Sequence, residues 1–135
     1  MSGMLPRVLF VDPDGHRALL AAAILREYAG DRFEALCAAT LPAPVSPFAV
    51  QALREFEILP QGLEVWQLGR TLPGDLAYAI ALDEGLELPP AGRKLVWPMP
   101  DPKVVNSPES FRNTADYIEI AVFDWLTQFD EREWE

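Results

Sequence analysis

The residues best suited to chemistry in this chain lie together near its N-terminus. Asp12, Asp14, His16 and Arg17 follow the apolar run 8–11 and precede a long helix-forming segment. A turn between a strand and a helix offers free backbone N–H groups and the positive end of the helix dipole, which together hold anions such as phosphate. Because this turn carries two carboxylates itself, they are either catalytic and metal-binding groups or structural groups within a former anion site.

The spacing of apolar residues predicts the elements that position this turn. Continuous apolar runs without polar alternation are typical of strands buried on both faces, and apolar residues three to four apart are typical of helices. Segment 65–68 fits a short element of either type. The predicted strands span 5–11, 33–39, 76–82 and 94–97, and the predicted helices span 16–28, 47–56 and the region from 108 onward. This alternation predicts an α/β fold around a short parallel sheet, in one domain over residues 1–135.

Composition limits the partners and the compartment. The net charge is −10, and residues 61–135 contain fourteen acidic but only six basic side chains. Such a surface repels nucleic acid and anionic membranes, so neither is an expected partner. Cys37 is the only cysteine, which excludes internal disulfides and cysteine-based metal clusters. We expect a cytoplasmic protein, because residues 1–6 do not resemble a signal peptide and no apolar run is long enough to span a bilayer.

Several segments together resemble the superfamily of low-molecular-weight protein tyrosine phosphatases and thioredoxin-coupled arsenate reductases. They are the strand, loop and helix around residues 8–28, segments 29–34 and 42–50, and the late segment Trp97-Pro98-Met99-Pro100-Asp101-Pro102. The resemblance covers nearly the whole chain. It implies a three-layer, flavodoxin-like fold with a four-stranded parallel sheet and helices on both faces. It also implies a loop of the form cysteine-x5-arginine after the first strand and a catalytic Asp-Pro pair, here Asp101 and Pro102.

The chain departs from this superfamily at its reactive positions. Asp12 stands where the nucleophilic cysteine is expected, and four residues rather than five separate it from Arg17. A carboxylate repels a phosphate dianion, and Pro13 lacks one N–H donor of the loop. Leu82 and the region around Glu87 stand where the additional cysteines of arsenate reductases are expected. We therefore expect neither a cysteine-dependent phosphatase nor a thiol-dependent arsenate reductase.

Two catalytic hypotheses remain for the carboxylates. The run Asp12-Pro13-Asp14-Gly15 is similar to the start of haloacid-dehalogenase phosphatases, in which the first aspartate is a nucleophile that works with Mg²⁺. That chemistry also needs a lysine and a further acidic pair, for which Lys94 with Asp83 or Glu84 are candidates only by elimination.

The second hypothesis starts from the resemblance, which implies that the Asp101 loop lies over the turn. Asp12, Asp14 and Asp101 would then form a site for a hard cation, Mg²⁺ or Ca²⁺.

A structural explanation of the same residues needs no metal. Asp12 caps the following helix, Asp14 belongs to an Asp-Gly turn, and Asp101 orders its own proline-rich loop. Arg17 then pairs with one of the neighbouring aspartates in the place of the missing oxyanion. His16, the sole histidine, is a candidate general base or simply a residue of the helix start.

We favour an inactive phosphatase-like protein, a pseudophosphatase that acts as a binding or regulatory module for a protein partner or for a second copy of itself. The alternative is an active metal-dependent phosphohydrolase that uses Asp12 in place of the superfamily cysteine. No cofactor is expected for the inactive protein, whereas Mg²⁺ or Ca²⁺ is expected for the metal-dependent enzyme. The candidate residues are Asp12, Arg17 and Asp101 at the former catalytic positions, Asp14, Gly15, His16 and Arg17 for ligand binding, and Asp12, Asp14 and Asp101 for a metal.

Overall fold

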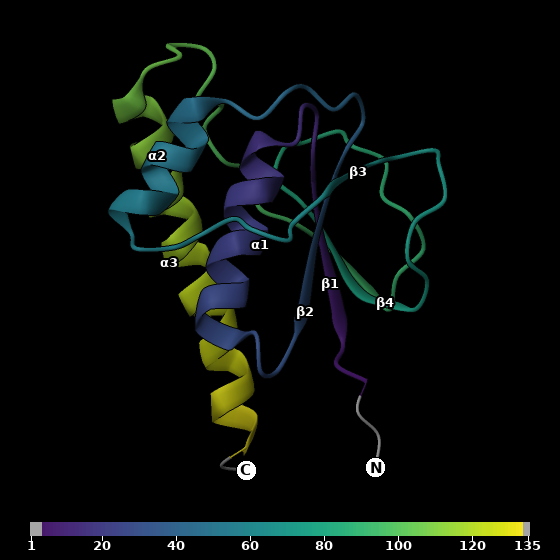
Figure 1. The fold of residues 1–135 in the computed structure, drawn as a ribbon. Helices are drawn as coiled ribbons and strands as arrows, with labels where there is room; N and C mark the ends of the chain where they lie inside the picture. Colours follow the sequence, from purple (N-terminus) through teal and green to yellow (C-terminus); the bar gives the residue numbers. More distant parts are fainter. Residues whose placement is uncertain (1–3, 134–135) are drawn as a thin grey trace.

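A computed structural model describes residues 4–133 of the chain, with side chains up to residue 129. Five parallel strands form one sheet in the order β3-β2-β1-β4-β5, and three helices pack beside it (Figure 1). The elements in chain order are β1 (Arg7–Asp12), α1 (His16–Ala29), β2 (Glu34–Ala39), α2 (Pro47–Glu55), β3 (Val65–Gln67), β4 (Leu76–Ala81), β5 (Arg93–Val96) and α3 (Pro108–Glu133).

The central strand β1 is apolar because both of its faces are covered. Residues 8–11 are fully buried, and Phe10 pairs with Cys37 of β2 and with Ile80 of β4. Asp12 ends β1 at the carboxyl edge of the sheet, where the chain turns into α1 (Figure 1). The predicted buried strand is thus confirmed, and it places the acidic turn at the middle of that edge.

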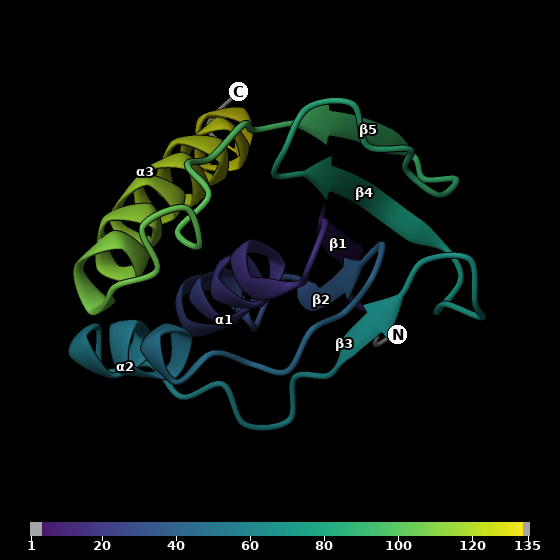
Figure 2. The same ribbon diagram turned by 90° about the horizontal axis from the view of Figure 1, so that it is seen from above.

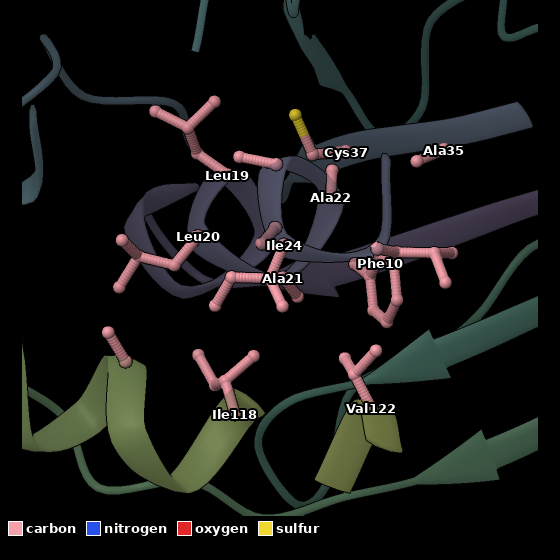
Figure 3. Close-up of a cluster of buried hydrophobic side chains, with 14 of the residues drawn as sticks. Phe10, Leu19, Leu20, Ala21, Ala22, Ile24, Ala35, Cys37, Ile118 and Val122 are labelled. Atoms are coloured by element: carbon pink, nitrogen blue, oxygen red, sulfur yellow. The ribbon is translucent and has the colours of Figure 1, made fainter. Parts of the chain in front are cut away.

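Helix α1 is apolar almost all round because it lies between the sheet and α3. Every residue from 16 to 25 is buried. Figure 3 shows Leu20 and Ala21 of α1 facing Ile118 of α3, while Val122 of α3 lies beside Phe10 of β1. The first turn of α1 is therefore held rigidly at its position above the sheet.

The strand count and the helix arrangement differ from the prediction. Segment 65–67 is a fifth strand, β3, because it pairs in parallel with residues 37–39 at one edge of the sheet. All three helices lie on the same side of the sheet, so the predicted helices on both faces are wrong (Figure 2).

Loops cover the helix-free face. They bury Leu9, Val11 and Ala38 beneath half-buried leucines. These loops, 68–75 and 82–92, are rich in glycine and proline, which do not sustain helices. Among residues 4–133, no helix combines the length and the apolar character needed to cross a bilayer.

Candidate functional site

The acidic turn is fixed from two sides. Gly15 caps α1 with a left-handed φ of 97°, and a Cβ atom there would lie 2.7 Å from a methyl group of Val65. On the other side, Leu41 N donates to Pro13 O at 3.0 Å and Ala43 N donates to Asp14 O at 3.1 Å. Only glycine satisfies both the backbone angle and the close approach at position 15. The turn is therefore a rigid structure.

The Asp12 carboxylate accepts the hydrogen bonds that an external anion would accept at this helix start. Its Oδ2 accepts from the backbone N–H of Arg17 at 3.1 Å and from Arg17 Nε at 3.3 Å, and its Oδ1 accepts from the backbone N–H of Ala18 at 3.2 Å. The side chain is fully buried. Gly15 holds the N-cap position, but the Asp12 side chain accepts from two first-turn N–H groups as a capping side chain does, and the predicted ion pair with Arg17 is confirmed.

Arg17 donates from each of its three guanidinium nitrogens. Besides the Nε bond to Asp12, Nη1 donates to the carbonyl oxygens of Leu82 at 3.3 Å and Met99 at 2.9 Å. Nη2 donates to Asp83 Oδ2 at 3.1 Å. The residue is 3% exposed. The guanidinium group is thus used for internal contacts and is not presented to solvent.

Asp14 and His16 form a second internal pair. Asp14 Oδ1 accepts from the backbone N–H of His16 at 3.0 Å, and His16 Nδ1 lies 3.1 Å from the same oxygen, out of line for a hydrogen bond. Ser46 N donates to His16 Nε2 at 3.0 Å, and the Pro44 carbonyl oxygen lies 3.2 Å from that nitrogen. His16 therefore fastens the loop before α2 to the acidic turn, and its ring is buried.

Burial and these pairs shift three pKa values. Burial and then the nearby Asp14 carboxylate raise the pKa of Asp12 to about 6, against the opposing charge of Arg17. Burial also acts to raise the pKa of Asp14, but the close ring, the backbone N–H and the charge of His16 outweigh it and lower that pKa below its ordinary value. Contact with Asp14 raises the pKa of His16. The ion pair with Arg17 and the two backbone N–H donors favour the ionised form of Asp12, against the effect of burial.

Asp101 does not join the other two aspartates. It is exposed, and its Oδ1 accepts from the backbone N–H of Lys103 at 2.9 Å. Within the described part of the chain, no three His, Cys, Asp or Glu side chains gather closely enough to hold a metal ion. The predicted convergence of Asp12, Asp14 and Asp101 is thus not found among the described residues. The prediction that the Asp101 side chain orders its own loop is confirmed.

Sequence reasoning missed Asp83 as a partner of Arg17. Asp83 lies just after β4, which neighbours β1, so both residues meet at the carboxyl edge of the sheet. The contact between Asp83 and Arg17 could be predicted only from the order of the strands in the sheet, which the sequence alone does not give.

Comparison with known proteins identifies the architecture. No protein-family model and no curated protein matches the chain. Among solved structures, an arsenate reductase in its reduced state has a TM-score of 0.80 at 20% identity, covering 93% of this chain and 99% of that one. The thioredoxin-dependent arsenate reductase of Corynebacterium glutamicum has a TM-score of 0.73 at 20% identity, covering 98% of this chain and 65% of that one. A protein tyrosine phosphatase has a TM-score of 0.73 at 15% identity, covering 93% and 95%.

The chain has their fold. This likeness agrees with the resemblance in sequence and concerns architecture alone.

Proposed function

We propose that this protein is a catalytically inactive relative of the phosphatases and arsenate reductases whose fold it has, and that it acts as a binding or regulatory module. The observation that carries the proposal is the position of the Asp12 carboxylate. It accepts from Arg17 N, Arg17 Nε and Ala18 N, the donors that would otherwise hold a substrate oxyanion.

Electrostatics support the exclusion of a phosphate ester from this turn. Two like charges about 4 Å apart repel by about 4 kcal/mol at an effective dielectric constant of about 20, and a dianion meets about twice that beside Asp12. Arg17 offers little compensation because each of its nitrogens already donates to a protein acceptor. Substrate binding would require several of these contacts to break at once.

The geometry also argues against Asp12 as a nucleophile. A nucleophilic carboxylate needs an accessible oxygen aligned with the phosphorus atom. Both oxygens of Asp12 accept backbone hydrogen bonds, and the side chain is fully buried. The pseudophosphatase proposal is therefore preferred over a metal-dependent phosphohydrolase.

Hydrolysis of p-nitrophenyl phosphate, measured with and without Mg²⁺, tests the proposal. The wild-type protein, Asp12→Asn and the exposed control Asp31→Asn should all remain at the buffer rate. Metal-dependent turnover that persists in Asp31→Asn and is abolished by Asp12→Asn would overturn the proposal and establish the hydrolase alternative.

We further propose that the module works in the cytoplasm, without a cofactor, through a protein partner or a second copy of itself. The strongly acidic composition supports a protein partner over nucleic acid or an anionic membrane. Light scattering after size-exclusion chromatography of the purified protein separates the two arrangements: a stable dimer supports self-association, and a monomer supports a different partner.

A further inference from the structure

A large hollow lies on the helix-free face of the sheet, and it adjoins the acidic turn through Thr40, which lines it and donates its backbone N–H to the Asp12 carbonyl oxygen at 3.4 Å. It has a volume of about 970 Å³ and is lined mainly by residues 68–76 and 85–90. These segments belong to the two loops that cross the sheet where the superfamily resemblance predicted helices, at the right of Figure 1. A hollow of this size falls within the range of pockets that take drug-sized molecules.

Leucine side chains dominate the walls. Leu68, Leu72, Leu86 and Leu88 line the hollow and are only half-buried, so each keeps apolar surface available to a ligand. Beneath them, Leu9 and other sheet residues are completely buried. The floor is therefore fixed by the core of the fold, while the walls offer apolar surface whose burial would favour binding.

Three charged side chains complete the lining: Arg70, Asp75 and Glu87. All three are exposed, and within residues 4–129 none of their side chains makes a hydrogen bond or an ion pair. Two unpaired carboxylates against one guanidinium group leave the lining with a net charge of −1, within a chain of net charge −10. Both the local and the overall charge favour a cationic ligand over an anionic one.

We propose that this hollow is a binding site for a medium-sized apolar molecule that carries a positive charge, such as an aromatic or aliphatic amine. The apolar body would pack against the leucines, and the ammonium group would lie near Asp75 and Glu87. None of residues 12–17 lines this hollow, so the proposal does not depend on whether the protein is an enzyme.

A matched series of probes tests both halves of the proposal: 2-naphthylmethylamine, 2-naphthalenemethanol and 2-naphthoate share one ring system and differ in charge. We expect the dissociation constant, followed by NMR titration of the full chain, to rise in that order, by about threefold per step. Shifted resonances should lie in segments 68–76 and 85–90. If no probe binds below about 1 mM, or if the shifts lie elsewhere, the site is refuted; if naphthoate binds as tightly as the amine, the ligand class is refuted.

Variants at exposed or half-buried positions sharpen the test without disturbing the core. Leu72→Gln should weaken all three probes about tenfold. Glu87→Gln should weaken only the amine, and Arg70→Gln should strengthen it, each by about threefold. Glu55→Gln on the helical side is the matched control and should change nothing. Equal affinity in the Leu72 variant and the wild type would overturn the proposal, provided that circular dichroism shows both folded.

Discussion

Replacing Asp12 with alanine tests whether its carboxylate takes the place of an anion. The change leaves the Arg17 and Ala18 backbone N–H groups and Arg17 Nε without their acceptor in a buried site. Removing one member of a buried ion pair typically destabilises a protein by about 3–5 kcal/mol, because the remaining charge and donors are unsatisfied.

Two observations place the expected loss at the lower end of that range. Asp83 still accepts from Arg17 Nη2, so the guanidinium group keeps one carboxylate partner. Burial of the Asp12 carboxylate, which raises its pKa, also makes its anion costly to hold in the folded state. We therefore expect Asp12→Ala to lower the free energy of unfolding by about 3 kcal/mol at pH 7, measured by urea titration.

Added sulfate should restore part of this loss. The variant frees three donors and the space of a carboxylate at the start of α1, which together form an anion site. Sulfate at about 50 mM stabilises the variant by about 2 kcal/mol if its dissociation constant is about 1 mM. The wild-type protein in the same sulfate concentration corrects for the general stabilising effect of this salt.

Asp101→Ala is the matched control, because the exposed Asp101 carboxylate accepts, among the described residues, a single hydrogen bond, from Lys103 N in its own loop. It should cost less than about 1 kcal/mol and gain nothing specific from sulfate. A loss in Asp12→Ala no larger than that of this control would contradict the role of Asp12 as a replacement for an anion. Equal stabilisation of the wild-type protein and the Asp12 variant by sulfate would contradict it too.

The pKa of Asp12 is raised from 3.8 to about 6, so between these pH values the folded protein binds a proton on Asp12 that the unfolded chain does not. The free energy of unfolding should therefore fall as pH rises from about 4 to about 6, by up to about 3 kcal/mol. Urea titrations of Asp12→Ala should not show this pH dependence. In Gly15→Ala the new Cβ would sit on a residue with a left-handed φ and 2.7 Å from a valine methyl group, so the free energy of unfolding should fall by about 2–4 kcal/mol in the same assay. Gly74 has open space around it, so Gly74→Ala should lower this free energy by less than about 0.5 kcal/mol. Ile118→Ala should cost about 2–5 kcal/mol because the side chain is fully buried, but Ile120→Ala, which is 65% exposed, should lie within about 0.5 kcal/mol of wild type; equal losses would contradict the packing of α3. Millimolar Mg²⁺ or Ca²⁺ should leave the melting temperature unchanged, and a rise that chelator reverses would reveal a metal site.

Local sequence patterns predicted the elements and the cap but not their final arrangement. The apolar run 8–11 and the helix signal after Gly15 depend on neighbouring residues only, and both elements form where the pattern places them. The short segment 65–67 fitted either element type, because pairing with β2 rather than propensity makes it a strand.

The prediction that helices cover the second face of the sheet was wrong because it rested on the superfamily resemblance and not on the residues of this segment. Gly69, Pro73, Gly74 and Pro89 lie in the two loops that cross this face, and these residues favour turns over helices. At the site, the Asp12 to Arg17 pair was predictable since the residues are neighbours in sequence. The contacts of Arg17 with residues 82, 83 and 99 were not, because they arise only when distant segments meet.

The contacts of Arg17 also have a consequence for the order of folding. They join residues that are 65 and 82 positions apart in the sequence, so they require closure of loops that include about half of the chain or more. The entropy of closing such loops disfavours these contacts in an early, partly folded state, whereas the nearby bonds between Asp12 and the first turn of α1 need only a short segment. Helix α1 and strand β1 can thus associate first, and the carboxyl edge of the sheet closes around Arg17 as a late step.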